Sequence, residues 1–137
     1  MPKYVITPEV ALRLAREGGP QPDGRQLLAP TLLRSQLLAL LYASVRRGEL
    51  TAREAERALD AVRALRLRLL GDRVLQSTAW RIAEQLDHPD TLAAEYLALT
   101  RLQADALVTL DPALAAAARG VVPVVGFEEL LPGQGRA

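Results

Sequence analysis

The 137-residue sequence contains no cysteine, one histidine and only five aromatic residues. The absence of cysteine excludes disulfides, thiolate metal sites and a cysteine nucleophile, and it is typical of a reducing compartment such as the cytoplasm. The single histidine, His88, lies beside Pro89 in a short connection, so no zinc site with several histidine ligands can form. No nucleophile elbow precedes His88, and we interpret it as an ordinary loop residue.

Long apolar runs and a strong net charge are also missing. The apolar stretch at the N-terminus is too short for a signal peptide, and no stretch approaches the roughly 20 apolar residues of a membrane span. With 17 basic and 16 acidic residues, the net charge of +1 gives no general attraction to nucleic acid or anionic membranes. Neither a Gly-x-Gly-x-x-Gly motif nor a Walker loop is present. We therefore expect a cytoplasmic protein with no membrane partner and no nucleotide site of these types.

Leucine, alanine and arginine dominate what is present. Half of the residues are hydrophobic, and a chain of 14.9 kDa can bury roughly two-thirds of its surface. We expect one folded domain over residues 1–131 and a disordered, frayed tail over residues 132–137. Sixteen of the 17 basic residues are arginine, which suits phosphate binding and is equally typical of a GC-rich genome.

Strand and helix patterns alternate along the chain. Continuous apolar runs predict strands at residues 4–6, 27–29, 106–110 and 121–125. Helical spacing predicts helices at about 8–17, 31–47, from 51 onward, 74–86, 91–102 and 113–118, with a last helical turn at 127–131. Residues 66–70 alternate arginine with leucine and fit either a strand or the end of the preceding helix. This order predicts an α/β fold, a three-layer α/β/α sandwich with a mainly parallel central sheet.

Capping residues mark several of the predicted helix starts. Thr7 and Thr31 precede helices as N-caps, Thr51 opens a capping box, and Asp111 is an N-cap followed by proline, the favoured first helical residue. Ligands of parallel sheets usually bind at the carboxyl ends of the strands. A functional site is therefore expected around residues 7–9, 29–31 and 109–111.

The order of four sequence stretches carries a resemblance to a known family. The stretches are YVITPEVAL (4–12), LAPTLLRSQLL (28–38), AAEYLAL (93–99) and LVTLD (107–111). Together they resemble the PIN domain, a family that includes the VapC toxins of bacterial toxin–antitoxin pairs. The resemblance covers residues 4–131 and is most specific over 92–114, and it implies the same α/β/α sandwich. Active members are Mg²⁺- or Mn²⁺-dependent endoribonucleases with three or four acidic residues around the metal.

At the acidic positions this chain departs from the family. The resemblance places those positions at Thr7, Gln36, Ala93 and Asp111, and only Asp111 keeps a carboxylate. Neutral oxygens bind a divalent ion more weakly than carboxylates do, and alanine offers no ligand. The resemblance thus implies a degenerate site in which Asp111 is a vestigial catalytic and metal residue, while Thr7, Gln36 and Thr109 line the cleft. We expect no tightly bound cofactor.

Two further acids lie close to these positions in sequence. Glu9 is two residues after Thr7, and Asp90 lies about one helical turn before the third family position. A competing interpretation is a working Mg²⁺- or Mn²⁺-dependent endoribonuclease of VapC type with a metal site rebuilt from Glu9, Asp90 and Asp111. The structural alternatives are a helix-dipole role for Glu9 and capping roles for the two aspartates. Gln36 lies on an apolar helix face and needs a partner, for which Thr7 and Asp111 are the candidates.

The preferred interpretation is a PIN-like protein that has lost nuclease activity and acts as a binding or regulatory module. The resemblance implies a homodimer and an antitoxin-like protein partner. Arg34, Arg46 and Arg47 are candidates for a weak RNA-binding patch, although the last two also suit a helix C-terminus. Few aromatic residues are available for base stacking. A plain oligomeric scaffold with no nucleic-acid role is the third interpretation.

Overall fold

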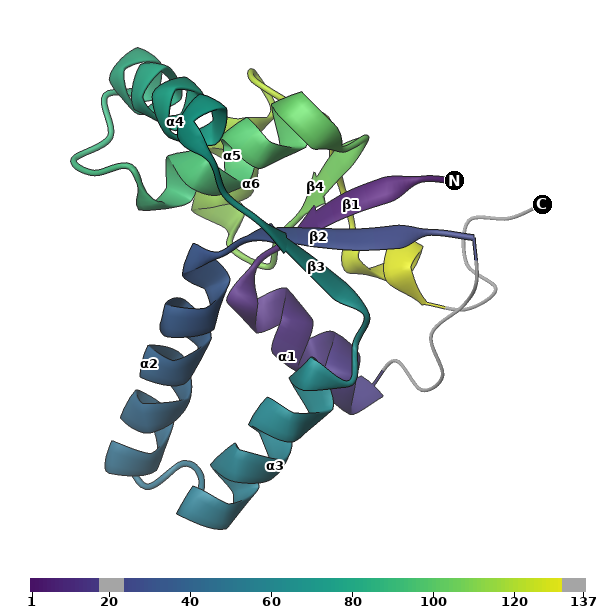
Figure 1. Cartoon of the computed structure of the whole chain (residues 1–137). Coiled ribbons are helices and arrows are strands. Elements are labelled where there is room, and N and C mark those ends of the chain that lie inside the picture. The colour runs from purple at the N-terminus through teal and green to yellow at the C-terminus, as the bar shows by residue number, and fades with distance from the viewer. Residues whose placement is uncertain (18–23, 132–137) are drawn as a thin grey trace.

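The computed structural model describes residues 1–17 and 24–131 (Figure 1). The predicted tail at 132–137 lies outside the described residues. The strands are β1 Lys3–Ile6, β2 Gln26–Pro30, β3 Leu67–Leu70, β4 Ala106–Val108 and β5 Val124–Val125. The helices are α1 Pro8–Glu17, α2 Leu32–Arg46, α3 Ala52–Arg63, α4 Arg73–Leu86, α5 Leu92–Gln103 and α6 Pro112–Ala118, followed by the 3₁₀ helix η1 Phe127–Leu130.

The strands form one parallel sheet in the order β3-β2-β1-β4-β5. Each strand is followed by a helical segment, as parallel crossovers require. Because the strands run in one direction, the carboxyl ends of β1, β2 and β4 meet at the same edge of the sheet. The predicted α/β/α sandwich with a parallel central sheet is confirmed.

Helices cover both faces of the sheet (Figure 1). Consecutive residues of a strand point to opposite faces, so Val5 belongs to the hydrophobic cluster built mainly with α4 and α5, and Ile6 to the cluster built with α1, α2 and α3. Leu107 and Val108 of β4 divide in the same way. The apolar runs in the sequence therefore correspond to strands that are buried on both faces of the sheet. Within the described residues, no helix is both long and apolar enough to span a bilayer.

The last two strands are shorter than the apolar runs predict. β4 ends at Val108, and Thr109 lies outside the strand in the turn before α6, where its hydroxyl accepts a hydrogen bond from the Asp111 backbone N–H at 3.1 Å. Before β5, the backbone N–H groups of Val121 and Val122 both donate to the Ala118 carbonyl at 2.8 Å. These two valines therefore complete the end of α6 and do not pair in the sheet. The ambiguous stretch at 66–70 is a strand, because Leu67–Leu70 pairs with β2.

The capping predictions give a mixed result. Thr51 and Glu54 form the predicted capping box at the start of α3. The prediction for Thr31 is wrong, since this residue has helical dihedral angles and its side chain makes no capping bond. Its backbone N–H donates to the Leu70 carbonyl at 3.1 Å, so Thr31 extends the pairing between β2 and β3 into the first turn of α2.

Candidate functional site

A cavity of about 370 Å³ lies at the carboxyl edge of the sheet. Its walls come from the residue after β1, the first turn of α1, the middle of α2, the start of α5 and the loop and helix that follow β4. The lining residues are Thr7, Pro8, Glu9, Gln36, Leu40, Asp90, Leu92, Ala93, Tyr96, Asp111 and Leu114. The cavity thus occupies the place where ligands of parallel sheets are expected.

This cavity gathers most of the site residues that were singled out in the sequence. Thr7, Gln36, Ala93 and Asp111 all line it, although they are spread over more than 100 residues of the chain. Glu9 and Asp90, the two candidate replacement acids, line it as well, whereas Thr109 does not. Tyr96 is a lining residue to which no role was assigned from the sequence. Tyr96 lies one helical turn after Ala93 on the same face of α5, and this spacing is the sequence signal that could have identified it as a cavity residue.

Gln36 and Tyr96 bond to each other across the cavity. The Tyr96 hydroxyl donates to the Gln36 side-chain carbonyl oxygen at 2.6 Å. The expected partners of Gln36, Thr7 and Asp111, are therefore wrong, because the phenol reaches it from α5. Tyr96 is almost fully buried. Burial and the nearby charges of Glu9 and Glu95 raise the pKa of the Tyr96 hydroxyl well above its usual value, which keeps the proton available for donation.

Thr7 holds a buried hydroxyl that lacks a hydrogen-bond partner within the part of the chain that the structure describes. The residue is 3% exposed, and its carbonyl oxygen accepts the first helical bond, from the Ala11 N–H at 2.9 Å. Its side chain does not make the predicted N-cap bond. A buried polar group without a partner destabilises the fold by about 1–3 kcal/mol. Such a group at the end of the central strand indicates a site whose polar contacts are incomplete.

The two aspartates of the cavity both act as caps. The Asp90 Oδ1 atom accepts from the Leu92 N–H at 3.0 Å, and the Asp111 Oδ1 atom accepts from the Ala113 N–H at 2.9 Å. Both residues are exposed, whereas Glu9 lies half-buried in the first turn of α1. Across residues 1–17 and 24–131, no three His, Cys, Asp or Glu side chains are placed to hold a metal ion together.

The donor set of the cavity does not fit a resident Mg²⁺ or Mn²⁺ ion. Hard divalent cations take several oxygen ligands, with carboxylates as the strongest protein donors. At Thr7, Gln36, Ala93 and Asp111 the chain presents a buried hydroxyl, an amide oxygen already bonded to Tyr96, a methyl group and one capping carboxylate. What the arrangement offers is a small hollow of mixed polar and apolar lining that includes the acidic side chains of Glu9, Asp90 and Asp111.

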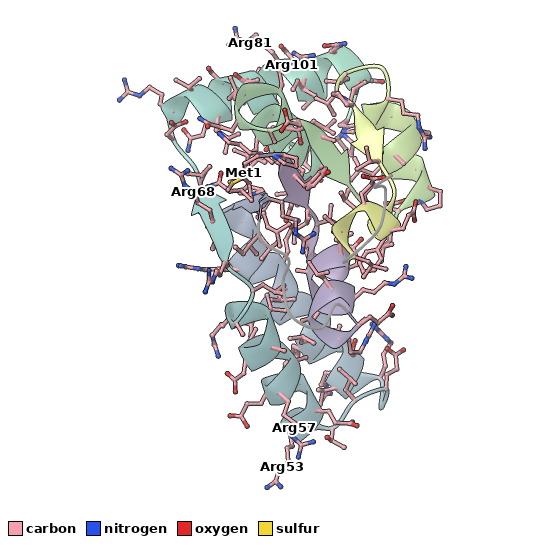
Figure 2. The ribbon with its side chains drawn as sticks, turned by 90° about the vertical axis from the view of Figure 1, so that its right-hand side faces the viewer. Met1, Arg53, Arg57, Arg68, Arg81 and Arg101 are labelled. Carbon is pink, nitrogen blue, oxygen red and sulfur yellow. The ribbon has the colours of Figure 1, made fainter. Side chains whose placement is uncertain are left out.

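The candidate RNA-binding arginines do not form one compact cluster. Arg34 is the third residue of α2 and Arg46 is its last, so about 18 Å of helix separates them. Arg47 is paired with Glu49 through hydrogen bonds of 2.8 and 3.1 Å, and hydrogen bonding to Glu49 raises the pKa of the Arg47 guanidinium. Figure 2 shows other arginines at opposite ends of the molecule, with Arg53 and Arg57 on α3 far from the α4–α5 end. Basic charge is therefore dispersed over the surface.

Comparisons with known proteins show a similarity of fold to solved structures. No protein-family model matches the sequence, and no curated protein matches it. The crystal structure of PAE2754 from Pyrobaculum aerophilum is similar over 93% of this chain and 91% of that chain, with a TM-score of 0.71 and 21% sequence identity. This similarity shows that the two proteins share a fold.

Thr7→Val is expected to stabilise the protein by about 1–2 kcal/mol, because the substitution replaces an unpartnered buried hydroxyl with a methyl group of similar shape. Thr100→Val is the matched control, since the Thr100 hydroxyl is equally buried and donates to the Tyr96 carbonyl at 2.8 Å. Loss of that bond is expected to destabilise by about 0.5–1 kcal/mol. Urea unfolding of both variants measures the difference. Equal destabilisation by the two substitutions would show that the Thr7 hydroxyl has a partner.

Proposed function

We propose that this chain is a PIN-like protein whose acidic site has lost metal-dependent nuclease activity and which acts as a binding or regulatory module. The observation that carries the proposal is the composition of the cavity at the carboxyl edge of the sheet. Three of its four family positions are Thr7, Gln36 and Ala93, and the fourth, Asp111, caps α6. The sequence resemblance over residues 4–131 supplies the family in this proposal, and the similarity to PAE2754 concerns the fold alone.

The proposed partners are proteins. A second copy of the chain and an antitoxin-like protein are the partners that the sequence resemblance implies, in a cytoplasmic setting linked to toxin–antitoxin systems. RNA is the weaker proposal, because Arg34 and Arg46 lie at opposite ends of α2 and Arg47 is paired with an acid. No tightly bound cofactor is part of the proposal.

One observation favours a second candidate function, a Mg²⁺- or Mn²⁺-dependent endoribonuclease of VapC type. Glu9, Asp90 and Asp111 all line the same cavity. Each aspartate uses its Oδ1 atom for its cap, and a carboxylate has a second oxygen that can bind a cation. The two functions differ in whether the native protein binds a divalent ion, and a binding measurement separates them.

Thermal unfolding with and without millimolar Mn²⁺ is the test. A ligand that binds only the native state stabilises it by about 2.7 kcal/mol at a concentration of 100 Kd, and Tm would rise by several degrees. We expect Tm to change by less than about 1 °C, relative to a buffer without Mn²⁺ whose ionic strength is matched with sodium chloride. The reason is that the donor set is too poor in carboxylates. Asp111→Asn serves as the site-specific control. A rise of several degrees that disappears in Asp111→Asn would establish the rebuilt metal site and refute the proposal.

A further inference from the structure

The cavity at the carboxyl edge of the sheet carries charge of one sign. Glu9, Asp90 and Asp111 line it, and within the described part of the chain no lysine, arginine or histidine does. Burial first, and then the charges of Glu9 and Glu95, raise the pKa of the Tyr96 hydroxyl, so the field of Glu9 reaches the wall formed by α5. Like charges that share one cavity repel each other. A positively charged ligand would offset this repulsion, so the cavity favours a cation.

Thr7 supplies a second observation that does not depend on the acids. This residue lines the same cavity at the end of β1 and is only 3% exposed. Its hydroxyl has no hydrogen-bond partner among the residues that the structure describes. A hydroxyl oxygen can accept a hydrogen bond from an N–H group of a ligand. The cavity therefore lacks a donor at Thr7 and a positive charge at its carboxylates, and an ammonium group supplies both.

The positions of the acids suit a cation larger than a metal ion. A hard divalent ion needs several oxygen ligands within about 2.0–2.6 Å of one point. Over residues 1–17 and 24–131, no three His, Cys, Asp or Glu side chains converge in this way. The three acids of the cavity come from the first turn of α1, the connection before α5 and the residue before α6. Carboxylates distributed around a cavity match a ligand that holds two charges apart.

The remaining walls and the size of the cavity indicate what joins the two charges. Leu40, Leu92, Ala93 and Leu114 contribute apolar side chains to the lining. Methylene groups are favourably removed from water against such surfaces. The volume of about 370 Å³ is near the lower end of the range for small-molecule sites, roughly 300–1,000 Å³. The ligand that matches this lining is a short chain of methylene groups with an ammonium group at each end.

We propose that this cavity binds a short aliphatic diamine, whose ammonium groups donate hydrogen bonds to the carboxylates and to the Thr7 hydroxyl. The inference rests on the proposed function, because it names the class of ligand that the binding module takes. Asp90 and Asp111 keep their helix caps in the bound state, since each cap uses the Oδ1 atom and a carboxylate has a second oxygen.

Isothermal titration calorimetry of the full chain with diaminobutane at low ionic strength tests the proposal. We expect a dissociation constant below about 1 mM. Butylamine has one ammonium group and represents a lysine side chain, and we expect it to bind at least about 10-fold more weakly. Butanediol has the same length as diaminobutane and no charge, and we expect no measurable heat. Added salt is expected to weaken the binding of diaminobutane, because exposed charges are screened.

Variants locate the binding at the cavity. Glu9→Gln and Asp90→Asn are each expected to weaken diaminobutane binding about 3- to 5-fold, because each removes one charge. Asparagine is also a good cap, so Asp90→Asn is expected to keep the fold. Asp72→Asn is the matched control, because Asp72 caps α4 by accepting from the Leu75 N–H at 2.8 Å and does not line the cavity. Thr7→Val is expected to weaken binding about 3-fold, because it removes an acceptor.

Four results would overturn the proposal. They are the absence of heat with diaminobutane, equal affinity for butylamine, equal weakening by Asp72→Asn and Asp90→Asn, and unchanged affinity in a folded Thr7→Val variant. All four leave the proposed loss of nuclease activity standing, since thermal unfolding with Mn²⁺ tests that separately. A Tm increase in Mn²⁺ that disappears in Asp111→Asn would refute the proposed function whether or not the diamine binds.

Discussion

A chain carrying Thr7→Asp, Gln36→Glu and Ala93→Asp together is expected to bind Mn²⁺ and to melt about 10 °C higher when the ion is present at 100 times its Kd. The three positions line one cavity with Asp111, so the substitutions bring four carboxylates to the same edge of the sheet. Hard divalent cations are held by such clusters. Without the ion the variant is expected to be less stable than the wild type, since two charges 4 Å apart repel by about 4 kcal/mol at an effective dielectric constant of 20.

Differential scanning fluorimetry with increasing Mn²⁺ measures this effect. The control is the same triple variant with Asp111→Asn, which keeps the added charges and removes the fourth ligand, and it is expected to lose most of the response. Because Thr7 is buried, a second variant with only Gln36→Glu and Ala93→Asp covers the case in which the triple variant does not fold. A folded variant of either kind with no response to Mn²⁺ would show that the family positions are misplaced on this chain.

The second large effect is expected in the core beneath the site. Leu97→Ala on α5 is predicted to destabilise the protein by about 3–4 kcal/mol, because a fully buried leucine is lost and a cavity remains. α5 also carries Ala93 and Tyr96, so the substitution tests whether the site depends on the packing of this helix. Leu92→Ala is the matched control, since Leu92 is 45% exposed on the same helix.

The Leu92→Ala control is expected to destabilise by less than about 1 kcal/mol. Urea unfolding measures both changes. A loss at Leu97 no larger than that at Leu92 would mean that α5 is not anchored in the core as the structure describes.

Local chemistry explains which features could be predicted from the sequence. The capping box at Thr51 and the cap at Asp111 each involve residues within three positions of one another, so the sequence alone contains the whole interaction. The bond between Gln36 and Tyr96 joins residues 60 positions apart and depends on where the fold places α5 relative to α2. Thr31 was predicted wrongly because its backbone is drawn into pairing with Leu70, a contact with another part of the chain.

The same reasoning applies to the candidate site as a whole. The location of the cavity could be predicted because parallel strands end at one edge of the sheet, and Thr7, Gln36, Ala93 and Asp111, which were selected from the sequence, all line it. The burial and the hydrogen-bond partners of each side chain could not be predicted, because they depend on residues that only folding brings together. Thr7 illustrates this, since a threonine before a helix predicts a cap and the structure shows a buried hydroxyl without a partner.

The walls of the cavity have a consequence for how this scaffold can change over time. The hollow is framed by strand ends and helix starts, and these are fixed by the hydrophobic layers on either side of the sheet. Its shape is therefore inherited from the architecture and does not require any particular ligand group inside it. Selection can exchange the side chains that face the opening while the frame persists, so one architecture can carry different chemistry at the same edge of the sheet.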